Sequence, residues 1–197
     1  MTAVTSYHRE NLRETLLELA ERTVQRSGVD ALSLRQLARD AKVSHGAPAR
    51  HFRDRQALLD ALALDGFQRL NRAMADAAQA PGSFDARFRA IATTYVTFAV
   101  DNAALLGLMY TVKHEAGASD ALVEAGRGSM RAAVDLIAEA QAAGAIAPDD
   151  DPERLALVAF ASVHGVAALA TGDLLEGVSV EEATDATVDV MLRGISR

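Results

Sequence analysis

The chain has 197 residues, with 20 Lys and Arg against 27 Asp and Glu, and half of its residues are hydrophobic. Because charged residues make up only 24%, the chain can bury a core, which excludes a disordered tail or a fibrous repeat. It contains no cysteine, which excludes disulfide frameworks, thiolate zinc sites, iron–sulfur clusters and cysteine nucleophiles.

The net charge of −7 is unevenly distributed along the chain. Residues 1–55 carry 10 Lys and Arg against 7 Asp and Glu, whereas residues 56–197 carry 10 against 20. A basic start on an acidic remainder predicts that the two parts face different partners. The N-terminus lacks the pattern of a secretory signal, and no segment approaches 18 uninterrupted apolar residues. We therefore expect a cytoplasmic protein that does not enter a membrane.

Helical periodicity runs through the whole sequence, and β-branched and aromatic residues never form an alternating run. Gly28 is a left-handed stop after the first helix, and Ser33 with Gln36 has the spacing of a capping box. The same spacing recurs at Ser179 and Glu182. We predict an all-α fold with nine helices, over residues 8–27, 33–41, 44–52, 54–79, 83–100, 103–112, 119–143, 152–169 and 179–193.

Two short predicted helices, 33–41 and 44–52, follow a longer one and are joined by a tight turn, which is the spacing of a helix-turn-helix. The second helix would lay its N-terminal half in a major groove about 12 Å wide. Arg50 is the best candidate reader, since its guanidinium can bind guanine O6 and N7 together. The free backbone N–H groups at the starts of the predicted helices, and the guanidinium of Arg55, can bind DNA phosphates. The candidate DNA-binding residues are Ser33, Ser44, His45, Ala47, Ala49, Arg50, His51 and Arg55.

The same spacing also fits an ordinary helical hairpin inside an all-α bundle. In that case His45 and Arg50 are solvated surface residues. His51 stands beside Phe52, so it is equally well explained as a packing residue or as a phosphate contact.

The stretch reads LARDAKVSHGAPARHF from Leu37 to Phe52 and is followed by Arg55 and Leu58-Leu59. It resembles the N-terminal domain of the TetR family of bacterial transcriptional regulators, over about residues 9–69. The resemblance implies a three-helix DNA-binding domain with its recognition helix over 44–51. It also implies that Phe52 is a core anchor and that Arg55 replaces a phosphate-contacting Lys.

Three residues differ from the pattern of that family. Lys42 stands where Gly is expected in the turn, and a Lys at positive φ there costs of order 1 kcal/mol. Ala49 replaces a common Tyr, and Pro48 has no N–H to bond the Ser44 carbonyl, which predicts a distorted first turn. The alternative is therefore a small-molecule-binding or protein-interaction module with weakened DNA binding.

Residues 83–195 are predicted to form a C-terminal ligand-binding and dimerisation bundle. The segments 84–99, 108–110 and 163–169 look like a subgroup of the same family marked by Trp followed by His-Gly, with Phe160 at the Trp position. Bundle pockets are typically apolar with a few polar groups, so a small apolar effector is implied. Its candidate contacts, each of which also fits plain core packing, are Phe88, Tyr95, Phe98, Met109, Tyr110, His114, Phe160 and His164.

Small and apolar residues recur at three and four positions on the last two predicted helices, which suits a four-helix contact between two chains. These faces could equally pack within one chain. The candidate dimer-interface residues are Leu155, Ala159, Ser162, Val163, Val166, Ala170, Thr184, Val188 and Met191.

Signatures of catalysis are missing from the sequence. The five His show no metal-binding spacing, and no phosphate loop, nucleophile elbow or dinucleotide fingerprint occurs. Asp149-Asp150-Asp151 fits an acidic turn before Pro152. We expect that the protein is not an enzyme and that it binds no metal ion or cofactor. The expected function is that of a homodimeric repressor which reads a pseudo-palindromic operator and is released by its effector.

Overall fold

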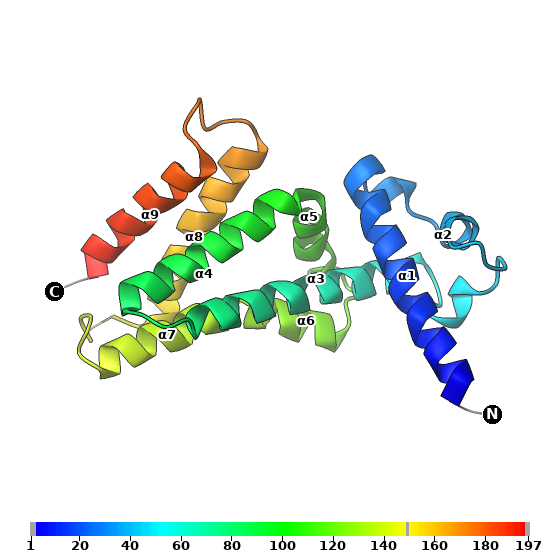
Figure 1. The fold of residues 1–197 in the computed structure, drawn as a ribbon, viewed down its shortest axis with the longest axis horizontal. Helices are drawn as coiled ribbons and strands as arrows, with labels where there is room; N and C mark the ends of the chain where they lie inside the picture. The colour runs from blue at the N-terminus through cyan, green and yellow to red at the C-terminus, as the bar shows by residue number, and fades with distance from the viewer. Residues whose placement is uncertain (1–2, 149, 196–197) are drawn as a thin grey trace. The chain divides into compact units, whose positions relative to one another are not determined.

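A computed structural model of the chain describes residues 3–148 and 150–195, with residues 3–11 as backbone only. All regular structure in these residues is helical, which confirms the predicted all-α class (Figure 1). The α-helices are α1 Ala3–Ser27, α2 Leu34–Asp40, α3 Arg55–Ala78, α4 Phe84–Asp101, α5 Ala103–Val112, α6 Asp120–Arg127, α7 Arg131–Ala142, α8 Pro152–Thr171 and α9 Val180–Ile195. Three short 3₁₀ helices are η1 Val29–Ala31, η2 Pro48–Arg50 and η3 Gly128–Met130. Asp149 of the predicted acidic turn lies outside the described residues.

Several helix boundaries follow from short-range capping signals. The Ser33 hydroxyl accepts a hydrogen bond from the Gln36 amide at 3.2 Å at the start of α2. At α9, Glu182 Oε2 accepts from the Ser179 amide at 3.0 Å, and the Ser179 hydroxyl accepts from the Glu182 amide at 3.1 Å. These bonds to the ionised carboxylate lower the pKa of Glu182. Both predicted capping boxes therefore mark helix starts, although only the second is reciprocal.

The predicted helix over 44–52 is wrong, because only η2 is helical there. Pro48 has no N–H to reach the Ser44 carbonyl, which accepts instead from the Ala47 amide at 2.9 Å. The amides of His51 and Phe52 both bond the Pro48 carbonyl at 2.9 Å. The segment is a turn followed by a single 3₁₀ turn.

The predicted continuous helix over 119–143 is also wrong, since α6 and α7 are separated by η3. Gly126 and Gly128 stand close together at this break, and glycine is a weak helix former. A Cβ on Gly126 would lie 2.9 Å from Cδ of Lys113, which follows α5, and 3.5 Å from the Phe67 ring of α3, so glycine leaves room for these side chains.

The chain forms two compact units, and α3 runs from one into the other. The first unit extends to Phe67 and includes Ala104–Gly126. A Cβ on Gly66 would lie only 2.6 Å from Sδ of Met109, which explains why a glycine stands in α3 where α5 packs against it. The carboxylate of Asp60 accepts from the amide and the hydroxyl of Ser119 at 2.7 and 2.8 Å, and so ties α6 to α3.

The second unit consists of Gln68–Ala103 and the chain from Arg127 onward. In it α4 packs against α7, α8 and α9, and α8 packs against α7 and α9. Arg89 of α4 donates to the carboxylates of Asp185 and Asp189 at 2.8 and 2.5 Å, which fixes α9 on α4. The buried side chains of its core include Ile91, Val96, Ala99, Leu136, Ile137, Ala156, Val166 and Leu192.

By length and composition alone, α8 is the one described helix apolar enough to cross a membrane. Taken as one segment, α4 and α5 are also long and apolar enough to cross a membrane, but the two helices are bent by 98° relative to each other. In the second unit α8 contacts α4, α7 and α9, and 22% of its apolar stretch is buried there.

Candidate nucleic-acid interface and ligand pocket

The turn after α2 has the strained backbone that the sequence predicts. Lys42 has φ of 55°, which L side chains rarely adopt. The Val43 amide bonds the Ala38 carbonyl at 3.0 Å and the Lys42 amide bonds the Arg39 carbonyl at 3.0 Å, which is the hydrogen-bond pattern of a Schellman stop. The turn therefore directs the chain from α2 into the segment 44–51.

The segment 44–51 presents most of its side chains to solvent. His45, Ala49 and Arg50 are exposed, whereas Pro48 is buried. Phe52, which ends the segment, is 2% exposed and lies under the guanidinium of Arg13, 5.6 Å from its ring centroid. Two buried anchors thus hold an irregular, exposed stretch on the first unit.

Four other predicted DNA contacts, namely Ala47, His51, Ser44 and Ser33, differ in how exposed they are and in what they contact. Ala47 and His51 are half-buried, and the His51 ring lies 6.4 Å from that of Phe52, which fits the packing explanation as well as a phosphate contact. Ser44 is exposed but does not begin an α-helix, so its predicted cap is wrong. Ser33 does cap α2, as predicted.

Arg55 has a structural connection that the sequence did not reveal. Its Nε donates to the Leu32 carbonyl at 3.0 Å and its Nη2 donates to the Val29 carbonyl at 2.6 Å. These bonds fasten the start of α3 to the segment that leads into α2. Phosphate contact by Arg55 stays a prediction, but the guanidinium already has a positioning role.

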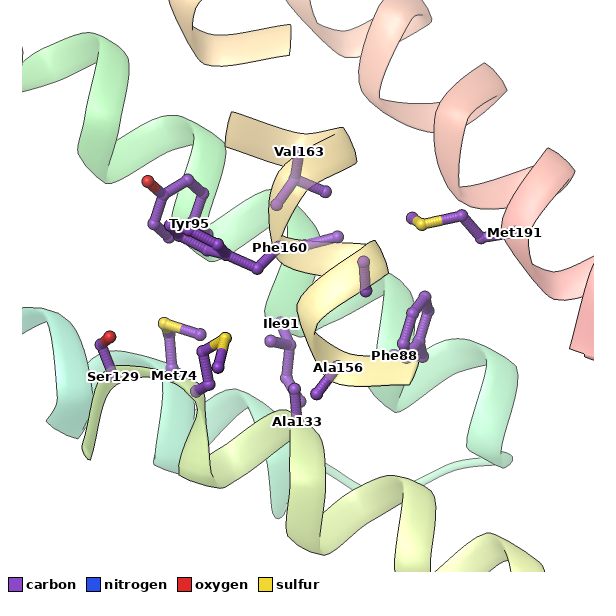
Figure 2. A pocket seen from close by; sticks show the side chains of 13 residues that line it. Met74, Phe88, Ile91, Tyr95, Ser129, Ala133, Ala156, Phe160, Val163 and Met191 are labelled. Atoms are coloured by element: carbon purple, nitrogen blue, oxygen red, sulfur yellow. The ribbon is translucent and has the colours of Figure 1, made fainter. Parts of the chain in front are cut away.

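The second unit contains a narrow cavity of about 30 Å³, which we call the apolar chamber (Figure 2). A space of this size holds about one or two water molecules. Three of its wall residues, Phe88, Tyr95 and Phe160, belong to the predicted set. Three flexible side chains that the prediction did not assign to a ligand also line it, namely Met74, Met130 and Met191.

His164 reaches the wall of the apolar chamber through Tyr95. The Tyr95 hydroxyl and His164 Nδ1 lie 2.7 Å apart in a hydrogen bond. Phe160 stacks on the His164 ring at 5.4 Å and meets the Tyr95 ring edge-on at 5.5 Å. His164 therefore orients wall residues, and it is not itself among the residues that line the chamber.

Four of the predicted ligand contacts lie elsewhere. Met109 is fully buried against Gly66 in the first unit, and Tyr110 there meets the Phe67 ring edge-on at 5.6 Å. His114 of the same unit is exposed. Phe98 lines a shallow groove on another face of α4. The prediction rested on residue size, which does not tell which face of a helix a side chain occupies.

The predicted dimer-interface residues are largely inside the protomer. Five of them are buried within the single chain: Ala159, Val163, Val166, Thr184 and Val188. Leu155, Ser162, Ala170 and Met191 are half-buried. The large exposed apolar side chains on these helices are instead Leu157, Val158, Leu169 and Val190, at 54%, 57%, 44% and 61% exposure. Both faces of α8 carry apolar residues. The residues that recur every three and four positions mark the face that packs inside the chain.

Within the described residues, no group of three His, Asp or Glu is placed to hold a metal ion. The candidate sites in these residues are therefore the exposed segment 44–51 in one unit and the apolar chamber in the other.

Comparison with known proteins gives a consistent result. Residues 16–62 match the model for bacterial regulatory proteins of the tetR family, and residues 88–195 match that for the tetracyclin repressor-like C-terminal domain. A solved protein with unknown function from Rhodococcus sp. RHA1 is 53% identical, with a TM-score of 0.89 over 94% of this chain and 96% of that chain. A comparison with curated protein sequences finds no match.

Two more distant structures share the fold. A TetR family transcription regulator from Marinobacter aquaeolei VT8 is 18% identical, with a TM-score of 0.72 over 98% of this chain and 100% of that chain. FadR from Bacillus subtilis, solved in complex with stearoyl-CoA, is 11% identical, with a TM-score of 0.76 over 92% of this chain and 98% of that chain. Since the two family models together span both the exposed segment and the cavity, the chain belongs to the TetR family of bacterial regulatory proteins.

Proposed function

We propose that this regulator is a repressor that binds a pseudo-palindromic operator as a homodimer in the cytoplasm. The observation that supports this most is the exposed segment 44–51, held by buried Pro48 and Phe52 after the turn at Lys42. Arg50 is exposed on it and can bind guanine O6 and N7. Two such segments in a dimer would meet half-sites about 34–36 Å apart.

Dimerisation in this proposal uses the exposed apolar side chains of α8 and α9. Leu157, Val158 and Val190 are more than half exposed, and they lie on two helices that pack against each other. Burying them against a second copy gains free energy through the hydrophobic effect. Light scattering should give the mass of a dimer for the full chain and that of a monomer for Val158→Glu. A variant that remains dimeric would assign the interface to another surface.

Release from DNA in this proposal depends on a small apolar effector in the second unit. A ligand shifts the population only by its difference in affinity between the two states, so the effector must bind the DNA-free arrangement more tightly. The methionines that line the apolar chamber are flexible enough to admit such a molecule.

The distorted recognition segment favours one alternative. Because η2 supplies only a single helical turn, we expect the chain in this alternative to contact fewer base edges than a regular recognition helix does. In this alternative the protein is a ligand-binding or interaction module with weakened DNA binding.

Fluorescence anisotropy of labelled DNA from upstream of the protein's own gene separates the two functions. A repressor should bind this DNA more tightly than scrambled DNA of the same length, and the affinity should fall with salt as phosphate contacts release counterions. Equal and weak binding to both DNAs would support the alternative.

A further inference from the structure

The apolar chamber adjoins a wider cavity in the same unit, which we call the polar chamber. This space of about 420 Å³ lies along the end of α3, the start of α4 and α7. Its volume falls in the range of roughly 300–1,000 Å³ usual for small-molecule sites. Apolar atoms form most of its wall, but it also includes these polar or charged side chains: Asn71, Gln79, Arg87, Arg131, Asp135 and Glu139.

The two chambers share part of one wall. Met74 and Ser129 line both of them, and each is less than a tenth exposed. Figure 2 shows the two side chains near each other at one end of the apolar chamber. Methionine has three rotatable side-chain bonds, so Met74 can change rotamer at the boundary between the two chambers.

The charges around the polar chamber are balanced. Arg87 donates two hydrogen bonds to the Glu139 carboxylate, at 2.8 and 3.0 Å, and a third to the Ala78 carbonyl at 2.5 Å. Hydrogen bonding to Arg87 lowers the pKa of Glu139, so the carboxylate stays ionised at neutral pH. Arg131 and Asp135 stand one helical turn apart on α7, and the two arginines and two acids cancel formally.

A charged ligand group would meet this wall at a disadvantage. An anionic group could bind Arg87 only by displacing Glu139 from it. A cationic group could bind Glu139 only by displacing Arg87. A hydroxyl or amide group needs no change in these ion pairs, because the wall already offers both donors and acceptors.

We infer that the effector is amphipathic, with an apolar part that enters the apolar chamber past Met74 and an uncharged hydrogen-bonding head in the polar chamber. This inference rests on the proposed ligand response and names the class of its ligand. The apolar chamber alone is too small for more than one or two waters, so the methionines must move when the ligand binds.

Three probes with the same decyl chain test the head group: monodecanoylglycerol, decanoate and decyltrimethylammonium. Titration calorimetry of the full chain, below the micellar concentration of each probe, should show the glycerol ester binding tightest. The inference is overturned if either ionic probe binds as tightly, or if none of the three binds.

Glu139→Gln provides the specificity test, and Glu181→Gln on α9, which does not line the chamber, is its matched control. Removing the Glu139 charge leaves Arg87 available to an anion, so decanoate should bind about fivefold more tightly, the change expected for one partly exposed ion pair. The glycerol ester should change much less. If Glu139→Gln raises the affinity for decanoate no more than the control Glu181→Gln does, the polar chamber does not hold the head group.

Anisotropy with operator DNA in the same samples keeps this inference separate from the proposed function. A chain that binds its operator but none of the probes would overturn the amphipathic effector while leaving the repressor intact. A chain that binds the glycerol ester but no DNA would contradict the repressor while supporting the two chambers.

Discussion

The two units of this regulator use opposite kinds of surface. In the first unit the candidate DNA contacts are exposed side chains on an irregular segment, and buried anchors such as Phe52 only hold them. In the second unit the candidate ligand contacts are themselves wall residues of a cavity, such as Phe88 and Tyr95. A change at an exposed contact should therefore alter binding without altering stability, whereas stability and binding are coupled wherever the functional side chain is also core.

This difference also explains what the sequence could predict. Helix caps and the turn at Lys42 depend on neighbours along the chain, and the structure has Ser33 as a cap, Ser179 and Glu182 as a reciprocal capping box, and Lys42 at positive φ. The pocket depends on which side of each helix faces inward, and the sequence pattern does not contain that information when both sides are apolar. Met74 shows the limit most clearly, because it stands in α3, outside the predicted ligand-binding range.

The recognition segment shows a different kind of limit. The sequence correctly predicts that Pro48 removes a bond to the Ser44 carbonyl, but it also predicts a helix over 44–52 that the structure does not have. One missing donor was enough to replace the α-helix with a turn and η2, because so short a helix has few other bonds to hold it.

The largest expected effect comes from removing an anchor of the first unit. Phe52→Ala should lower the free energy of unfolding by about 3–5 kcal/mol, the usual cost of truncating a buried Phe. Urea denaturation followed by circular dichroism measures this. A variant with unchanged stability would show that Phe52 does not anchor the segment.

Arg50→Ala should leave stability unchanged and reduce discrimination at one operator position by about 1–3 kcal/mol. The reason is that its side chain is exposed, so its loss removes a base contact but no packing. Binding to a library of operators with single base changes measures the effect. A uniform loss across all positions would contradict a reading role.

Arg55→Ala should lower the free energy of unfolding of the first unit by roughly 1–2 kcal/mol, measured by urea denaturation, since two hydrogen bonds within the chain are lost. Because those bonds go to the Val29 and Leu32 carbonyls, the slope of log affinity against log salt should not change. A slope smaller by about 0.9 would instead show that Arg55 contacts a phosphate.

Lys42→Gly should stabilise the first unit by about 0.5–1 kcal/mol, because glycine adopts φ of 55° without a Cβ clash. The gain is partly offset by the greater freedom of glycine in the unfolded chain. Thermal melting measures the change, and a lower melting temperature would contradict the account of the turn.

The smallest expected effect is pH-dependent and lies at the start of α9. The capping box lowers the pKa of Glu182 in the folded chain below its unfolded value, so its contribution is present at neutral pH and lost as the pH falls through the folded pKa. The stability difference between the wild type and Glu182→Ala should therefore shrink in acid. Glu181→Ala, one residue earlier, is the control, and a difference that grew in acid would contradict the assignment.

The central claim is that the exposed segment 44–51 of this TetR family protein reads DNA. Selection of bound sequences from a random DNA pool, by the full chain and by Arg50→Ala in parallel, tests it most directly. The account predicts a palindromic consensus for the wild type, with a guanine in each half-site that the variant no longer selects. Enrichment of no common sequence by the wild type would contradict it.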